Sequence, residues 1–385
     1  MRSILVELRP PTTHNSTNVS HRRVTKTRLQ TMKTLAEKKR AHEVFWRGEG
    51  PGLLLTPTAA MDQYDLAGYR ERFENPELMW RAEMRRAQPV LDWPTDGIPT
   101  VRPNLGVVFV PAIAGTDYRI PDGSMPWPGS PLTRDAIRAI KERDVASARL
   151  MQLAREFYAI HEARGETEIA AYHPDTQGVF DIAHLLAGEE IFLQLSDEPD
   201  WIHELMELGL ELYVRVSREL KTMLRQPPGE MIHGHGTPQG IYFPHAGVRI
   251  SEDTPTLLSP KMLAAVVLPF IERAATPFGG AFVHYCGKHN AFFEQLCRCP
   301  QVRAIDLGNS ESYDLRWLLA QCAGGGKVLY SRIAAQPGED WQRYLRRIAA
   351  AIRETGARVV LRPMVFPETR AECQAMLDLW HELTA

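Results

Sequence analysis

A histidine and a cysteine two positions apart form the stretch of this sequence that is best suited to chemistry. His284 and Cys286 lie in the apolar run Phe282-Val283-His284-Tyr285-Cys286-Gly287. In an extended strand the side chains alternate between two faces, so these two point the same way, with Cα atoms roughly 7 Å apart. This spacing suits two ligands of one metal ion or a catalytic pair, and the alternative is a packed thiol beside a hydrogen-bonded histidine. The glycine allows a sharp exit from the strand, which places the pair at a strand's C-terminal end, where α/β barrels carry their chemistry.

Further candidate ligands and one acidic residue lie near other strands. His233, His235 and His245 fall within thirteen residues, and the first two share one face if their segment is a strand. Imidazole is a competent metal ligand, so these residues could complete a site with the His-x-Cys pair. Alternatively, they line a polar cavity or bind backbone carbonyls. Asp306 ends the next apolar run along the chain, which is the position of a pocket residue.

The elements that must position these residues alternate regularly. Short apolar runs are separated by segments of helical periodicity, which calls for a parallel sheet covered by helices. About eight such units that close on themselves give the economical arrangement. The sequence therefore predicts an α/β fold, a single (β/α)8 TIM barrel with an N-terminal helical extension that begins near Lys33. Strands are expected near residues 53–55, 101–110, 168–172, 231–249, 282–286, 304–308, 328–330 and 359–361.

Composition limits the class of protein. The chain has 385 residues, of which 44% are hydrophobic and 24% charged, as in ordinary globular proteins. Its net charge of −2 argues against nucleic acid or an anionic membrane as partner and leaves a small-molecule substrate. No apolar run is long enough to cross a bilayer. Five cysteines, an odd number, without a signal-like start fit a reducing cytoplasm.

The first residues differ from the rest of the chain. Residues 1–30 are rich in Thr, Asn, Ser and Arg and lack periodicity, so we predict a disordered tail. An organelle transit peptide, or translation that begins at Met32, are the alternatives. The barrel is then expected to occupy residues 31–385.

The amino-acid sequences of four segments, and their order along the chain, resemble those of a known family. The segments are Gln177–Ala183, Glu252–Thr254, Leu258–Pro260 and His284–Gly287. From about residue 45 to residue 383 the chain resembles the uroporphyrinogen decarboxylase superfamily, which includes corrinoid-dependent methyltransferases. The resemblance implies a barrel with its site at the C-terminal ends of the strands, but it does not settle the reaction.

Two branches of that superfamily require different residues. Decarboxylases resembling this chain carry an Arg-Gln-Ala-Gly-Arg segment for a substrate with many carboxylates, whereas Leu54–Ala59 stands here without arginine. The methyltransferase branch holds zinc, which activates a thiol that takes a methyl group from a corrinoid on a separate protein. His284 and Cys286 match two zinc ligands of that branch. Its third ligand, a cysteine near the last strand, is missing from Arg362–Phe366.

The missing cysteine leaves the completion of the metal site open. A stable catalytic zinc site needs about three protein ligands and one open position. The candidates are His233, His235, His245, Glu252 and Asp253, and we favour His235 and His245 beside the His-x-Cys pair. Without such a ligand, the site would bind zinc weakly or not at all.

Acidic residues are the candidates for proton transfer. The resemblance places Glu252 and Asp253 at the barrel mouth, where one could orient a ligand histidine or act as general acid or base. A solvated loop with a helix-capping task is the alternative. With Asp306 they form our predicted catalytic set.

The sequence thus predicts an enzyme of the methyltransferase-like branch, with possible zinc and a corrinoid-protein partner. One alternative is a decarboxylase of a porphyrinogen or another carboxylic acid. A second alternative is a non-catalytic barrel that binds a small ligand or a corrinoid partner.

Overall fold

The computed structural model describes residues 33–57 and 66–385. The predicted tail of residues 1–30 and the alternative start at Met32 lie outside the described residues. Residues 33–385 form one compact unit. It begins with helix α1 (Leu35–Arg47), which confirms the predicted N-terminal helix, and Thr34 caps this helix through its side chain.

The strands form one large parallel sheet, a smaller mixed sheet and a hairpin. The large sheet has six strands in the order β1, β12, β11, β10, β9, β8, and all its pairs are parallel. The four-stranded sheet has the order β5, β2, β7, β6. The strands are β1 (Leu53–Leu54), β2 (Ile98–Val101), β3 (Tyr118–Arg119), β4 (Trp127–Pro128), β5 (Ala170–Ala171), β6 (Met231–His233), β7 (Gln239–Phe243), β8 (Val248–Ser251), β9 (Ala281–Tyr285), β10 (Val302–Leu307), β11 (Val328–Ile333) and β12 (Arg358–Pro363).

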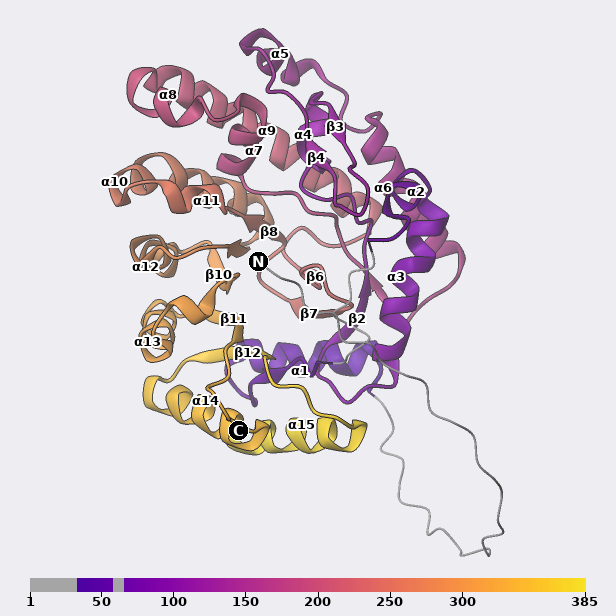
Figure 1. Ribbon diagram of the computed structural model, residues 1–385, viewed down its shortest axis with the longest axis vertical. Helices are drawn as coiled ribbons and strands as arrows, with labels where there is room; N and C mark the ends of the chain where they lie inside the picture. The colour runs from indigo at the N-terminus through magenta and orange to yellow at the C-terminus, as the bar shows by residue number, and fades with distance from the viewer. Residues whose placement is uncertain (1–32, 58–65) are drawn as a thin grey trace, which may run out of the picture. The chain divides into compact units, whose positions relative to one another are not determined.

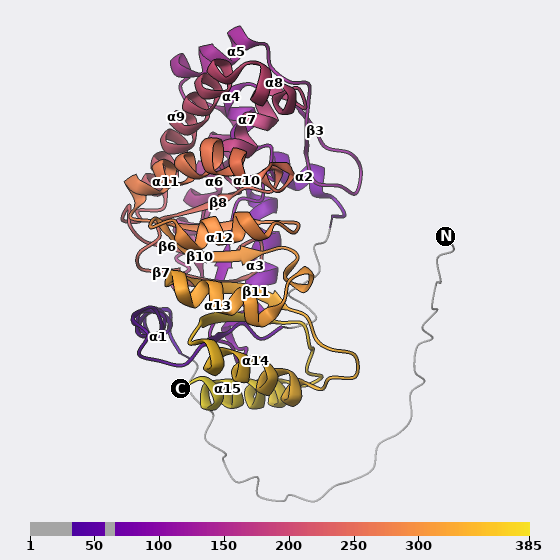
Figure 2. The same ribbon diagram turned by 90° about the vertical axis from the view of Figure 1, so that its left-hand side faces the viewer.

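Helices connect the parallel strands and cover their outer face, as Figures 1 and 2 show for α11 to α14 beside β8 to β12. The remaining helices are α2 (Tyr69–Glu74), α3 (Pro76–Leu91), α4 (Phe109–Ala114), α5 (Arg134–Arg138), α6 (Arg149–Ala163), α7 (Val179–Ala187), α8 (Ile191–Asp197), α9 (Pro199–Met223), α10 (Pro260–Met262), α11 (Leu268–Ala275), α12 (Asn290–Arg298), α13 (Leu315–Gly325), α14 (Trp341–Thr355) and α15 (Arg370–Thr384). Short helical turns are η1 (Ala139–Glu142), η2 (Thr254–Leu257), η3 (Leu263–Val267), η4 (Thr276–Phe278) and η5 (Ser310–Ser312).

This architecture agrees with the prediction at the level of fold class. A central parallel sheet with alternating helices is consistent with a TIM-like barrel. A continuous ring of eight hydrogen-bonded strands is not shown among the described residues, because β2 and β5 pair with each other and not with the six-stranded sheet. The segment between β5 and β8 also differs from a βα unit. It contains the antiparallel pair of β6 and β7, and β7 pairs with β2.

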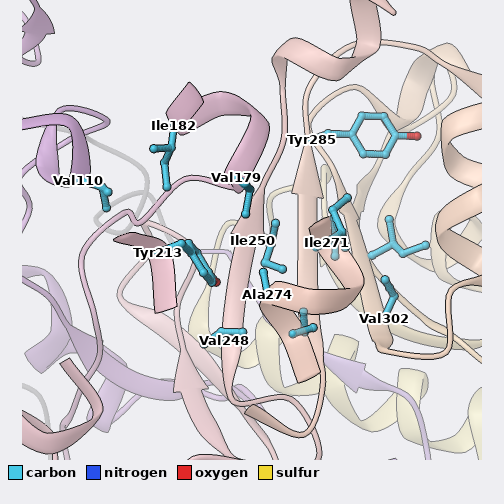
Figure 3. Close-up of a cluster of buried hydrophobic side chains, with 14 of the residues drawn as sticks. Val110, Val179, Ile182, Tyr213, Val248, Ile250, Ile271, Ala274, Tyr285 and Val302 are labelled. Atoms are coloured by element: carbon cyan, nitrogen blue, oxygen red, sulfur yellow. The ribbon is translucent and has the colours of Figure 1, made fainter. Parts of the chain in front are cut away.

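Side chains alternate between an outer and an inner core along each strand. On β8, Val248 and Ile250 pack toward helices that carry Ile271 and Tyr213 (Figure 3). On β9 the outer set includes Val283, whereas the neighbouring residue Phe282 belongs to a separate inner cluster. The inner cluster also contains Leu53 of β1, Leu55 just after β1, and residues of β10, β11 and β12, namely Ala304, Val328, Tyr330 and Val360. The alternation of side chains along a strand, with a period of two residues, therefore decides which residues face the interior.

One predicted strand is partly wrong. The apolar run Val107–Val110 was expected to continue a strand and loop after residue 101, but Phe109 begins helix α4. A short, fully buried apolar run has the same composition in either element, so its periodicity does not distinguish them. Among the described helices, none is long and apolar enough to cross a membrane.

Candidate metal and catalytic site

The strand register brings His284 and Asp306 side by side at the carboxyl ends of β9 and β10. Phe282 on β9 and Ala304 on β10 face the interior. His284 and Asp306 lie two positions after them, so they face the same side of the sheet. Both side chains are buried, with exposed fractions of 6% for His284 and 2% for Asp306. The C-terminal edge of the parallel sheet thus places an imidazole and a carboxylate together, as predicted for a barrel site.

Asp306 binds two imidazoles through one carboxylate oxygen. Its Oδ2 lies 2.7 Å from His284 Nδ1 and 3.0 Å from His235 Nε2. Burial favours a raised pKa for Asp306, but the two histidines hold this pKa well below its usual value. Burial lowers the pKa of His235 to about 3, so its ring is neutral at pH 7 and donates from Nε2. The carboxylate therefore fixes the orientation of both rings.

The other ring nitrogen of His284 faces a thiol and a second carboxylate. Its Nε2 lies 3.5 Å from Cys286 Sγ and 3.8 Å from Asp253 Oδ1. The same Asp253 oxygen accepts a hydrogen bond from the backbone N–H of Cys286 at 2.6 Å. The potential ligand atoms of Asp253, His284 and Cys286 all lie within 4.8 Å of one another. Asp253 therefore offers a third potential ligand atom beside those of His284 and Cys286.

This donor set fits the ion that the family resemblance implies. Histidine nitrogen, cysteine sulfur and aspartate oxygen are all zinc ligands, and three protein ligands are typical of a catalytic site. Asp306 behind His284 has the place of the carboxylate that orients a zinc-bound histidine. Cys286 is exposed and the Asp253 side chain is 46% exposed, so the set can be reached from solvent.

The surroundings of Cys286 disfavour its thiolate. Although the residue as a whole is exposed, its thiol is partly buried, and this partial burial, followed by the charges of Asp253 and Asp306, raises the pKa of Cys286 to about 11. The protein's own groups therefore favour the protonated thiol at neutral pH. A metal cation has the opposite effect, because a coordinated thiol is deprotonated.

Glu252 has a different task from its neighbour Asp253. It is fully buried, and its carboxylate lies 3.1 Å from the backbone nitrogen of Phe180 and 3.0 Å from that of Asp181, in the first turn of α7. Gly178 permits this contact, because a Cβ there would lie 2.3 Å from the Glu252 carboxyl carbon. Burial and the nearby Asp181 raise the pKa of Glu252 well above its usual value. Glu252 thus has the helix-capping task of the alternative, although in a buried position and not in a solvated loop, and its catalytic role stays a prediction.

Asp181 positions Asp253, although it is not among the site residues predicted from the sequence. Its carboxylate accepts hydrogen bonds from the backbone N–H groups of Asp253, at 2.9 Å, and Thr254, at 3.0 Å. Burial and the charge of Asp253 raise the pKa of Asp181 to about 7. Asp181 lies inside the Gln177–Ala183 motif, so the motif carried the signal, although only the fold shows which backbone it holds.

The structure corrects the expected relation between His233 and His235. Strand β6 ends at His233, and His235 lies in the following turn with a φ of 47°. The two residues therefore do not share a strand face. Instead, the backbone N–H of His235 donates to His233 Nδ1 at 3.0 Å, and the His235 ring reaches Asp306. His235 therefore lies next to His284 through its contact with Asp306, and it does not contact Cys286.

His245 is not brought to this cluster. It is exposed and precedes β8, so it lies at the amino-terminal end of the parallel strands. There it lines a pocket with Trp46, Arg303 and Arg358. The prediction that His245 ligates the same metal as His284 is therefore wrong, because a residue before a strand and a residue after one lie at opposite ends of the sheet.

Three buried polar atoms near the site have no hydrogen-bond partner among the described residues. They are His235 Nδ1, Tyr330 Oη and Arg249 Nε. Arg249 uses its other nitrogens, which lie 2.7 Å from Asp175 and 3.0 Å from Ser251. Buried polar groups are nearly always satisfied in proteins, so these three atoms are exceptions in the interior next to the cluster. The strand alternation could have selected Tyr330, which faces inward two residues after Val328.

Comparison with known proteins supports the fold. A solved structure of a methyltransferase from Methanosarcina mazei is similar to this chain, with a TM-score of 0.60 and 15% sequence identity. The similarity covers 90% of this chain and 99% of that chain. No family model and no curated protein sequence matches. At this identity the likeness concerns the fold alone, and the resemblance to the uroporphyrinogen decarboxylase superfamily stays a prediction.

Proposed function

We propose that this protein is a zinc-dependent methyltransferase that transfers a methyl group from a corrinoid on a separate protein to a thiol acceptor. The observation that carries the proposal is the cluster of Asp253, His284 and Cys286, whose ligand atoms lie within 4.8 Å of one another. Its place at the C-terminal edge of the parallel sheet and the fold likeness to a methyltransferase support it. Asp253 takes the role of the third ligand, for which the sequence offers several candidates.

A bound zinc ion would supply Lewis acidity that keeps an acceptor thiol ionised at neutral pH. His284, Cys286 and Asp253 would hold it. The other residues act by positioning these three. Asp306 accepts a hydrogen bond from Nδ1–H of His284 and so directs the lone pair of Nε2 toward Cys286. Asp181 fixes the backbone that carries Asp253.

Metal analysis of protein purified without a histidine tag tests the ligand set. Wild-type protein is expected to hold near-stoichiometric zinc. Asp253→Asn, His284→Ala and Cys286→Ser are expected to hold little, because two remaining ligands seldom retain zinc. His245→Ala is the matched control and should keep its zinc. Wild-type zinc below about a tenth of an equivalent after supplementation would overturn the metal assignment.

A methyl-transfer assay tests the reaction. Free methylcobalamin replaces the corrinoid protein, and a small thiol serves as acceptor, with loss of the methylcobalamin absorbance as readout. We expect turnover by the zinc-loaded wild type and by His245→Ala, and none by Cys286→Ser. Turnover that is equal in wild type and Cys286→Ser would contradict the proposal.

Decarboxylation is the rival reaction, and a parallel assay separates the two. Uroporphyrinogen is incubated with the same preparations, and coproporphyrinogen is measured. Robust formation of coproporphyrinogen that persists in Cys286→Ser would replace the methyltransferase proposal with a decarboxylase.

A further inference from the structure

Two arginines lie side by side near the carboxyl-terminal ends of two neighbouring strands. Arg332 on β11 and Arg362 on β12 are direct partners in the parallel register. Arg332 lies two residues after Tyr330, and Arg362 lies two residues after Val360, both members of the inner cluster. Both arginine side chains are therefore on the interior-facing side of their strands. The register of the sheet therefore places two guanidinium groups on neighbouring strands and on the same face.

Neither guanidinium has an acidic partner in the part of the chain that the structure describes. No hydrogen bond or ion pair there involves the side chain of either residue, and the guanidinium of Arg362 lies 5.6 Å from the ring centroid of Tyr330. Single exposed arginines without partners are common on protein surfaces, and Arg346 on α14 is another. Adjacency is what distinguishes Arg332 and Arg362, because two like charges on paired strands destabilise each other until an anion neutralises them.

The two arginines share a cleft and not a convex surface. The cleft is also lined by Leu55, Thr237, Pro363 and Phe366. Thr237 belongs to the turn between β6 and β7 that also carries His235, so the cleft opens on the side of the sheet that bears the site. Phe366 is 59% exposed and Met364 is 42% exposed, an uncommon state for large apolar side chains at a concave surface. Positive charge beside apolar surface fits a small molecule with an anionic end and an apolar body.

The strand register also relates these arginines to Cys286. Tyr285 pairs with Leu307, Leu307 with Ser331, and Ser331 with Leu361. The next residues along the four strands form one layer, which reads Cys286, Gly308, Arg332 and Arg362. Gly308 adds no side chain between the thiol and the arginines, and a Cβ there would lie 2.4 Å from Cys286 Sγ.

We infer that Arg332 and Arg362 form an oxyanion-binding subsite that holds a carboxylate or phosphate group of the substrate in the same interior-facing layer as Cys286. Guanidinium groups bind both anions through paired hydrogen bonds. Adjacent strands are spaced by about 4.8 Å, so the arginine backbones lie roughly 10 Å and 14 Å along the sheet from Cys286. The substrate is thus an elongated molecule with its reacting end at Cys286 and its anionic end at β11 and β12. The inference relies on the proposed function only for the identity of the reacting end.

Calorimetric titration of metal-free full-length protein with inorganic phosphate and with acetate tests the subsite directly. We expect saturable binding of at least one anion, and the tighter of the two identifies the phosphate or carboxylate class. Arg332→Ala and Arg362→Ala should each weaken binding about tenfold or more, as expected for loss of a charge-assisted pair. Because both arginines hold one anion, the double variant should lose little more than either single variant. Arg346→Ala is the matched control and should bind as wild type does.

Further variants separate this inference from the metal proposal. His284→Ala should bind the anion as wild type does, even if the zinc assignment fails. Anion binding that is lost in His284→Ala and kept in Arg332→Ala would overturn the inference, because the anion would then occupy the metal site. No saturable binding of either anion would also overturn it.

A variant of residues 58–65, which lie outside the described residues, completes the test. Asp62→Asn combined with Asp65→Asn removes the carboxylates that follow Pro57 in the sequence. We expect unchanged anion binding in this variant. Binding that appears only in this double variant would show that the arginines serve the chain's own carboxylates, and it would overturn the inference. Thermal unfolding of each variant verifies folding, and the exposed Arg332→Ala variant should unfold as wild type does.

Discussion

Arginines lie at both ends of the parallel strands, but their side chains have acceptors within the chain at one end and none among the described residues at the other. At the amino-terminal end, Arg303 donates to the backbone carbonyls of Gly279, His245 and Pro300 at 3.0 to 3.2 Å. Arg358 donates to a carbonyl there as well, that of Trp46, at 2.6 Å.

At the carboxyl end, Arg332 and Arg362 have no such acceptors among the described residues. Donors that are satisfied by the chain's own carbonyls stabilise the fold, whereas open donors are available to a ligand. The comparison predicts that substitutions at the two ends affect different measurements.

The largest expected difference is between two histidines, one at each end. His284→Ala removes the central ligand of the proposed site, and we expect methyl transfer to fall by at least about a thousandfold, as for loss of a group essential to the chemistry. His245→Ala at the other end should change the rate less than about twofold, because this side chain is exposed and far from the site. If both variants lost methyl-transfer activity equally, the two ends of the strands would not differ in function.

A smaller effect is expected from a positioning residue. Asp306→Asn keeps the size of the side chain but removes the charge that orients His284. Zinc affinity should fall about 10- to 100-fold, as for other outer-sphere carboxylates. A competition titration with a chelator measures the affinity, and the restored affinity of Asp306→Glu would show that charge and not packing is responsible. Unchanged affinity in Asp306→Asn would remove Asp306 from the site.

Arginines at the two ends should separate stability from binding. Arg303→Ala removes three exposed hydrogen bonds to backbone carbonyls, and we expect a loss of about 0.5 to 1.5 kcal/mol in the free energy of unfolding with anion binding unchanged. Arg332→Ala should change stability by less than about 0.5 kcal/mol. Denaturant unfolding and the phosphate titration are measured on both variants. A large loss of stability in Arg332→Ala would mean that this residue has a structural partner.

The smallest effect concerns pH and a histidine with a structural role. His42 on α1 is fully buried, its Nε2 lies 2.9 Å from the Asp96 carbonyl, and its Nδ1 accepts the backbone N–H of Tyr242 at 2.9 Å. Burial lowers the pKa of His42 to about 4, from an ordinary value of 6.5. Between these values the unfolded chain binds a proton that the folded chain does not. Stability is therefore complete above pH 6.5 and decreases as pH falls toward 4, by about 1 kcal/mol between pH 6.5 and 5.5.

A substitution tests this pH dependence. His42→Gln does not titrate in this range, so the slope of unfolding free energy against pH should decrease by the contribution of one proton. An unchanged slope in His42→Gln would show that His42 is protonated in the folded protein at these pH values.

Prediction from the sequence succeeded where the information is local. The period of two along a strand correctly placed His284 and Cys286 on one face, with His284 Nε2 3.5 Å from Cys286 Sγ. The prediction failed for residues 107–110, where helix and strand share one composition. It also failed for His235, because the turn between β6 and β7 was taken as part of a strand.

The sequence by itself therefore determined which side chains each strand presents and in which direction, since alternation along an extended chain needs no distant contact. It determined the rhythm of strands and helices from β8 to the end, and the position of the His-x-Cys pair at the end of a strand. Only the tertiary structure decided which strands are neighbours and in which register. That decision joins Asp253 to Cys286, Asp306 to two histidines, and Arg332 to Arg362. The physical reason is that register is set by the packing of a whole buried face, a free energy spread over many residues far apart in the chain.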